Sequence, residues 1–199
     1  MLNSIKKSAV TKIGAKIILS RTFKHNFMRS FNTFTHIFKN QIDKLLQSNL
    51  FYGRKNKNVL WPTEWTFLIN IAVYKSVVSY NKKYQNNKLM MQPETSGRFP
   101  SDFTIFSPNG KKIIVIEHEN SLMFNKIKHN YIKLVEINDC EYRLLICYIN
   151  TKNTPKGLIE KLQKVKSKNK YKKPVNVLVA YKCDSKLFQS SKSFLHDVV

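Results

Sequence analysis

Acidic residues are scarce in this chain of 199 residues. Twelve aspartates and glutamates stand against 35 lysines and arginines, which gives a formal net charge of +23. A balance this basic implies an anionic partner. No segment approaches the roughly 18 uninterrupted apolar residues of a membrane-spanning helix. We therefore expect nucleic acid, and not a membrane, to be that partner.

Glycine and cysteine are also few, and their scarcity excludes several classes of enzyme. The five glycines form no phosphate-binding loop, and no Ser/His/Asp order is present. Cys140, Cys147 and Cys183 are odd in number and share no C-x-x-C spacing. They predict reduced thiols in an intracellular protein, without a zinc site or a disulfide framework. Kinases, serine hydrolases and zinc proteins are thus set aside.

The sequence does contain enough apolar residues for a folded protein. Hydrophobic residues make up 42% of the chain, with 13 phenylalanines and 9 tyrosines. This length predicts one main domain that buries a real core. We expect a basic, mostly helical N-terminal extension over 1–58, an α/β core over 59–184 and a C-terminal tail over 185–199. A docked terminal helix is expected in the tail.

The N-terminal extension has three interpretations that the sequence leaves open. Its first 42 residues carry eight lysines and arginines and no acid. Five phenylalanines recur near every fourth residue, which is typical of a helix that packs on a core. A basic arm on phosphate and a mitochondrial transit peptide share the same composition. The last interpretation would place the protein in the mitochondrial matrix of a eukaryote. The phenylalanines are Phe23, Phe27, Phe31, Phe34 and Phe38.

The order of the predicted elements indicates the class of fold. Apolar periodicity predicts a helix, three strands, a helix, a strand, a helix and a strand. This order is typical of an α/β fold with a mixed central β-sheet flanked by helices. The first helix is expected to begin at Thr63 as its N-cap. The expected ranges are 63–80, 88–94, 99–106, 111–119, 121–137, 141–149, 155–166 and 175–181.

The second and third predicted strands form a hairpin that carries three acids. Its turn is Ser107-Pro108-Asn109-Gly110, since proline presets φ while asparagine and glycine tolerate positive φ. A loop of these four residues would pair Phe106 with Lys111. Asp102 would then lie opposite Val115 and share a face of the sheet with Glu117 and Glu119. The inference depends on register, because a slip of one residue would move Asp102 to the other face.

The three acids have two interpretations. Carboxylates at a strand end are most often only solvated. Like charges that converge, however, cost stability unless a cation or a proton lies between them. Of five acids between Lys44 and Val135, three fall in this hairpin. A sparse acidic cluster in a basic protein is what a Mg²⁺ (or Mn²⁺) site beside a polyanion requires.

Pro100-Ser101-Asp102, followed after fourteen residues by Glu117-His118-Glu119, resembles the PD-(D/E)XK nuclease signature. The resemblance implies a restriction-endonuclease-like core and a metal-dependent endonuclease that acts on double-stranded or branched DNA, often as a homodimer. Glu119 departs from the family, which usually has lysine there, although a minority of restriction enzymes have E-x-E. The departure leaves two alternatives open: an inactive nuclease-fold protein that binds nucleic acid, and a basic ribonucleoprotein component.

The resemblance also implies roles for the acids. Asp102 and Glu117 are expected to hold Mg²⁺ or Mn²⁺, and Glu119 to orient or deprotonate a bound water. Glu64 stands on the helix before the hairpin, where related nucleases often have an accessory metal ligand. A carboxylate stabilised by the helix N-terminus is its plainer interpretation. His118 is expected to pack in the core and to leave the sheet on the face opposite Glu117.

Three cations are candidates for contact with nucleic acid. Arg98 lies just before the hairpin. Lys126 and Lys133 share one face of the helix that follows it, and this face is expected to point outward. Lys126 is the nearest downstream cation that could replace the lysine absent from position 119.

Overall fold

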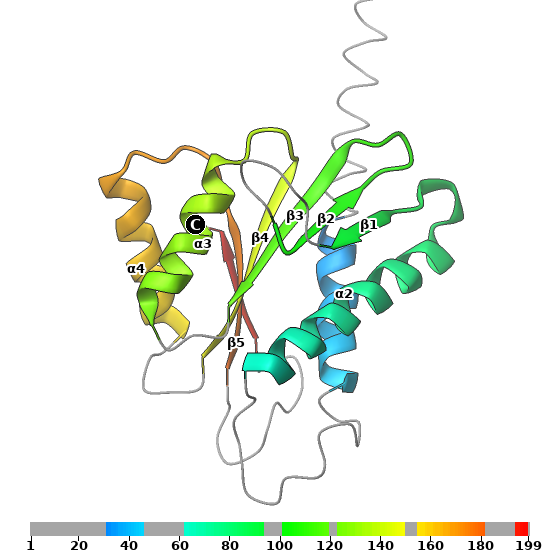
Figure 1. The fold of residues 1–199 in the computed structure, drawn as a ribbon, viewed down its shortest axis with the longest axis horizontal. Helices are drawn as coiled ribbons and strands as arrows, with labels where there is room; N and C mark the ends of the chain where they lie inside the picture. The colour runs from blue at the N-terminus through cyan, green and yellow to red at the C-terminus, as the bar shows by residue number, and fades with distance from the viewer. Residues whose placement is uncertain are drawn as a thin grey trace, which may run out of the picture.

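The computed structural model describes residues 31–45, 62–93, 101–119, 123–149, 155–181 and 194–198. Six strands form one sheet in the order β1 to β6, and helices cover both of its faces (Figure 1). The predicted α/β fold, a mixed central sheet flanked by helices, is confirmed. Among the described residues, no helix has the length and apolar character needed to cross a membrane.

The sheet is antiparallel at both edges and parallel in the middle. The first three strands form a meander, β4 and β5 run parallel to β3, and β6 is antiparallel to β5. Along the chain, the order of strands and helices from α2 through β5 agrees with the predicted one. The bounds are β1 Met90–Pro93, β2 Phe103–Phe106, β3 Lys112–Glu119, β4 Tyr142–Ile149, β5 Asn176–Tyr181 and β6 Phe194–Val198.

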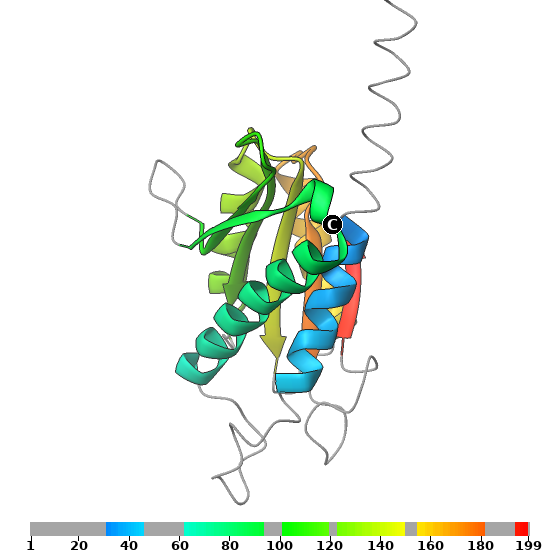
Figure 2. The same ribbon diagram turned by 90° about the vertical axis from the view of Figure 1, so that its right-hand side faces the viewer.

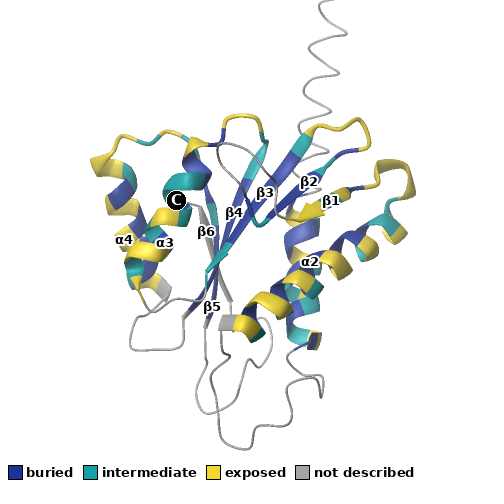
Figure 3. Cartoon of the chain, in the orientation of Figure 1, coloured by how far each residue is buried: buried dark blue, intermediate teal, exposed yellow. Residues whose placement is uncertain are grey.

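Each face of the sheet carries its own pair of helices. Helix 31–45 and α2 (Pro62–Lys83, followed by the 3₁₀ turn η2, Gln85–Asn87) lie side by side on one face (Figure 2). The other face is covered by α3 (Phe124–Glu136) and α4 (Pro155–Lys168). Strand residues alternate between two buried clusters, one under each pair of helices. The outward faces of α2 and α4 are exposed (Figure 3).

Helix 31–45 belongs to the core, although the predicted boundary placed it in an extension. Its inward side chains are at most 3% exposed: Phe31, Phe34, Phe38, Ile42 and Leu45. The core-packing interpretation is therefore confirmed for this part of the phenylalanine repeat. Phe23, Phe27 and the rest of 1–30, on which the alternatives of a basic arm and a transit peptide depend, lie outside the described residues.

The start of α2 differs from the prediction by one residue. The helix begins at Pro62, so Thr63 lies inside it and is not its N-cap. Proline fits the first helical position, because its missing N–H has no partner there in any case. One turn further, Trp65 is fully buried and stacks on Tyr148 of β4 at 5.1 Å between ring centroids. This contact holds α2 against the middle of the sheet.

The end of the chain forms a strand where a helix was expected. Phe194–Val198 is β6, and its residues pair with β5 from Asn176↔Val198 to Ala180↔Phe194. Without β6, β5 would be an edge strand with unpaired backbone N–H and C=O groups. Pairing satisfies these groups, and a local helix would not. The prediction failed because it considered the segment without its neighbour.

The hairpin between β2 and β3 has the predicted turn but not the predicted register. Gly110 has φ +77° and donates to the carbonyl of Ser107 at 2.9 Å, as expected of this turn. The loop is one residue longer than predicted, since Phe106 pairs with Lys112. That change alone would move Asp102 to the other face of the sheet.

A β-bulge restores the face. Ile105 pairs with Ile114, so Ile113 is an extra residue on β3. Consistently, Ile113 and Ile114 are neighbours in sequence but bury in the same cluster. The two offsets together shift the register by two residues and keep its parity. Continuing the pairs Thr104↔Val115 and Phe103↔Ile116 places Asp102 opposite Glu117, and not opposite Val115 as predicted.

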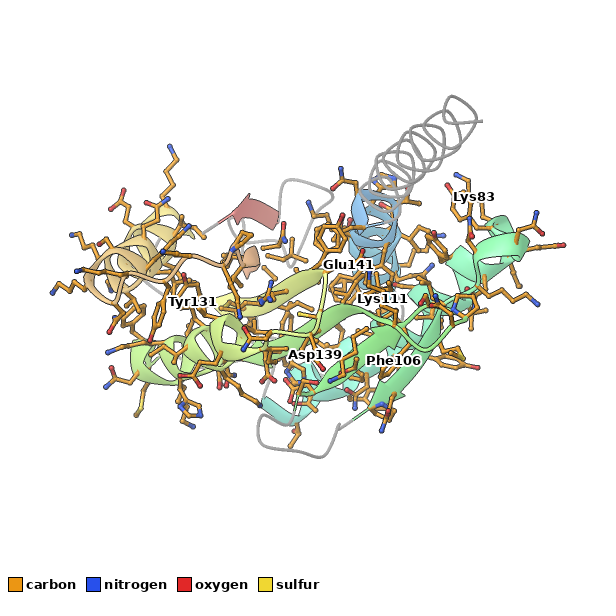
Figure 4. All side chains as sticks on the ribbon, turned by 90° about the horizontal axis from the view of Figure 1, so that it is seen from above. Lys83, Phe106, Lys111, Tyr131, Asp139 and Glu141 are labelled. Atoms are coloured by element: carbon orange, nitrogen blue, oxygen red, sulfur yellow. The ribbon has the colours of Figure 1, made fainter. Side chains whose placement is uncertain are left out.

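Two exposed ion pairs hold the start of β3 against the segment that leads into β4. Lys111 lies 2.5 Å from Glu141, and Lys112 lies 2.6 Å from Asp139 (Figure 4). Pairs at such exposed positions contribute little to stability. They lie at the opposite end of β3 from Glu117.

The cysteines with described surroundings are free thiols. Cys147 is buried in β4 and Cys140 is partly buried before it. Burial raises the pKa of both thiols. Cys183 lies outside the described residues.

Candidate functional site

A buried carboxylate marks the last part of β3. Glu117 follows a run of apolar β3 residues, and its side chain is 2% exposed. It faces α3, because Val115 on the same side of the strand belongs to the α3–α4 cluster. A charge taken out of water here requires a partner.

Lys133 is that partner. It stands in the last turn of α3, and its Nζ lies 2.8 Å from Oε1 of Glu117. The Lys133 side chain is itself only 19% exposed. The Lys133 ammonium and this carboxylate oxygen form an ion pair, but their relative orientation is not that of a hydrogen bond. The contact therefore joins α3 to β3 through two largely buried charges.

Asp102 supplies a second carboxylate. It lies directly before β2, and its Oδ2 accepts a hydrogen bond of 2.7 Å from the backbone N–H of His118. About a third of its side chain is exposed, so the pair of acids is open to solvent from the side of Asp102. The bulged hairpin thus brings Asp102 to Glu117 by a register different from the predicted one.

The pKa of Glu117 records this environment. Burial, followed by the charge of Asp102, raises the pKa to about 7. The close approach and charge of the Lys133 ammonium, and a backbone hydrogen bond from Asp102, act in the opposite direction and are weaker. The protonated form of Glu117 is therefore favoured up to a much higher pH than for an ordinary glutamate. A second cation close to both carboxylates would favour its ionised form.

His118 lies on the opposite face of β3, as predicted. Its ring packs against Phe103, with 6.3 Å between centroids, and its Nε2 lies 3.8 Å from Oδ2 of Asp102. Burial lowers the pKa of His118, against the opposing effect of the Asp102 charge. The prediction of a packed histidine is confirmed.

One face of α3 looks toward the end of β3. Lys126, Asn130 and Lys133 follow at i, i+4 and i+7, and the Nδ2 of Asn130 lies 3.5 Å from the carbonyl oxygen of His118, to which it donates. The expectation that this face points outward was wrong for Lys133, which turns inward to Glu117. Lys126 is exposed on the same face, nearer the start of α3.

Of the other predicted site residues, two are partly buried and one lies outside the described residues. Glu119 is half-buried on the same face as Glu117, beside Cys147 of β4, and its charge adds to the burial that raises the thiol pKa. Glu64 is half-buried in the first turn of α2, the helix that covers the opposite face of the sheet. Arg98 lies outside the described residues.

Within the described segments, no three His, Cys, Asp or Glu side chains gather closely enough to hold a metal ion. The predicted cluster of three carboxylates is therefore reduced to a pair, Asp102 and Glu117, with Lys133 beside it. This donor set still fits Mg²⁺, which usually takes one or two carboxylates and completes its shell with water and phosphate oxygens.

Comparisons with known proteins add little to this geometry. No family model matches the chain, and no curated protein matches it. Among solved structures, SfsA of Pyrococcus furiosus in complex with Ca²⁺ is similar at a TM-score of 0.36 and 12% identity, over 66% of this chain. The chain spans 62% of the length of that protein. A likeness of this size establishes neither a common family nor a common activity.

Proposed function

We propose that this protein is a divalent-metal-dependent endonuclease that hydrolyses phosphodiester bonds in nucleic acid, with DNA as its substrate. The observation that carries the proposal is the ion pair of Glu117 with Lys133, next to the partly exposed carboxylate of Asp102. Two acids for a metal and one lysine for phosphate are the groups that such hydrolysis needs. The resemblance of the hairpin motif to PD-(D/E)XK nucleases supports the same function.

In this proposal, Lys133 fills the role for which Lys126 was the candidate. Its ammonium reaches Glu117 from α3, and so provides the cation that Glu119 does not. Lys133 follows Lys126 by seven positions and lies on the same face of the helix, so residue spacing alone is compatible with either lysine in this role. Only the packing of α3 on β3 distinguishes them. Lys126, exposed on that face, would contact a neighbouring phosphate.

Each side chain then has a distinct task. Asp102 and Glu117 would hold Mg²⁺ or Mn²⁺. Among the described residues, Glu64 on α2 does not join them in a group of three acids. An ion held there would supply Lewis-acid chemistry: polarisation of the scissile phosphate, a lower pKa for water, and stabilisation of the oxygen that leaves when its P–O bond breaks. Glu119 would orient that water and accept its proton. Lys133 would offset the charge that develops on the phosphate oxygens.

Cleavage of supercoiled plasmid tests the proposal. With Mg²⁺ or Mn²⁺ the protein should nick or linearise the plasmid, and EDTA should stop the reaction. Asp102→Asn and Lys133→Met should each lower the rate at least 100-fold, since each removes a group that acts on the reacting phosphate. Rates are read from the loss of supercoiled DNA on gels.

Matched variants separate the site from nonspecific effects. Asp139→Asn removes an acid at the other end of β3, and Lys75→Met removes an exposed lysine from α2. Both should cut at the wild-type rate. Equal cutting by the Asp102→Asn protein, or plasmid that stays intact at every metal concentration, would reject the nuclease.

One observation favours a second candidate, a nuclease-fold protein that binds nucleic acid without cutting it. Lys133 already neutralises Glu117, so the acid pair is partly compensated by the protein itself. Titration calorimetry with Mg²⁺ distinguishes the two functions. A nuclease should show a divalent site that Asp102→Asn abolishes, whereas the binding protein should show none.

A further inference from the structure

The cations of this protein are distributed unevenly between the two helical layers. The layer of α3, α4 and the following residues 169–175 contains eleven lysines and two glutamates. The opposite layer, helix 31–45 and residues 62–89, contains six lysines and two acids. The richer layer lies on the face of the sheet toward which Glu117 points.

The lysines of α4 form an exposed row beside α3. Lys161, Lys164 and Lys168 are exposed and follow at i, i+3 and i+7. The Nζ of Lys161 lies 5.7 Å from the ring centroid of Phe124, in the first turn of α3. This contact places one end of the row beside the start of α3, where Lys126 is exposed.

We infer that the outward surface of α3 and α4 binds the phosphate backbone of a nucleic-acid duplex. The inference rests on nucleic acid being the partner, as the proposed function requires. A row of exposed lysines attracts phosphates by charge and reads no sequence. The row would hold duplex along the outer surface of α4, beside α3.

The distribution of aromatic residues favours a duplex over a single strand. Proteins that bind single strands stack bases on exposed aromatic rings. Among the described residues, the largely exposed aromatic side chains are Phe67 and Tyr74, and both stand on α2 on the opposite layer. On the lysine-rich layer, Tyr171 packs against Tyr131 and is only partly exposed.

Two charge-reversal variants with the same net charge test the surface. The first combines Lys161→Glu, Lys164→Glu and Lys168→Glu on α4. The matched control combines Lys75→Glu, Lys82→Glu and Lys83→Glu on α2, which are also exposed. Binding of a labelled 30-base-pair DNA duplex is measured by anisotropy in EDTA between 50 and 300 mM NaCl. Cleavage does not contribute under these conditions.

The salt dependence of binding gives the expected result. Each phosphate contact contributes about 0.9 to the slope of log K against log salt. The α4 triple should therefore lose about 2 to 3 from the slope and about 100-fold in affinity at 100 mM NaCl. For the α2 triple, the slope should fall by less than one third of the fall expected for the α4 triple. Equal losses in the two triples would overturn the inference, because net charge alone would explain them.

Further arms identify the ligand and separate this inference from the proposed function. An RNA duplex decides between the two duplex types. Equal affinity for single-stranded oligo-dT, or tighter binding to anionic phosphatidylserine vesicles, would overturn the inference that this surface binds a duplex. In EDTA, Asp102→Asn should still bind duplex, while its cleavage in Mg²⁺ falls at least 100-fold, so that loss of cleavage does not count against the surface. If the α4 triple does not fold, Lys→Gln changes at the same positions replace it, with the same slope change as the criterion, because glutamine also removes the three phosphate contacts.

Discussion

At the scale of single residues, Glu117 is the unusual group of this molecule. The pKa of its carboxyl group, about 7, is well above the ordinary value of 4.5. The folded state therefore holds a proton that the unfolded chain releases. Between about pH 4.5 and 7, ionisation of Glu117 costs the folded state free energy, and its stability falls as pH rises.

Glu117→Gln should remove this dependence. Its free energy of unfolding relative to wild type should increase from pH 5 to pH 7.5, by at most about 3 kcal/mol. Urea denaturation in EDTA at several pH values measures the difference. Asp139→Asn is the control. The hydrogen bond from Lys112 lowers the pKa of Asp139, so the titration of Asp139 does not change the free energy of unfolding in this pH range. Parallel pH profiles for wild type and the glutamine variant would contradict the prediction.

How far the site was predictable differs from residue to residue. Asp102 and Glu117 were found by composition, since few acids exist and three fall in one hairpin. Lys133 was seen only as one of two lysines on a helix face. The choice between them depends on how far α3 extends along β3, and sequence spacing contains no such information.

At the scale of elements, the turn of the hairpin fixes where Asp102 lies. Gly110 has positive φ, and a Cβ added there would meet no atom within 4 Å. Gly110→Ala should therefore cost only backbone strain, about 1 to 2 kcal/mol of unfolding free energy. Gly110→Asn should cost less, because asparagine tolerates this conformation. An alanine variant as stable as wild type in urea would refute the strain.

Helix 31–45 should prove indispensable to the core. Phe34, on the inward side of this helix, is fully buried, so Phe34→Ala should lower the free energy of unfolding by about 3 to 5 kcal/mol. The exposed neighbour His36 is the control, and His36→Ala should change stability by less than about 0.5 kcal/mol. Similar losses in both variants, measured by urea denaturation, would show that burial on this helix is not decisive.

Elements that depend on local pattern were predicted, and those that depend on a neighbour were not. Strands β1 to β5 and helices α2 to α4 follow from apolar periodicity, with ends shifted by a few residues. β6 was not foreseen, because its reason is the open edge of β5. The bulge at Ile113 was not foreseen either, since no residue type announces it.

At the scale of the whole molecule, excess positive charge opposes folding. A net charge of +23 on 199 residues brings many cations closer together in the folded state than in the unfolded chain. Raising NaCl from 20 to 200 mM shortens the Debye length from about 21 to about 7 Å. The melting temperature should therefore rise over this range, as measured by circular dichroism. A falling melting temperature would show that attractive pairs outweigh the repulsion.

The extra residue in the hairpin loop and the extra residue at Ile113 behave like a pair of compensating frameshifts. Either one alone would turn every later side chain of the partner strand to the wrong side, and together they restore it. Deleting one loop residue should thus be harmful, and deleting Ile113 as well should act as its intragenic suppressor. In a lineage, the two irregularities would be gained or lost together.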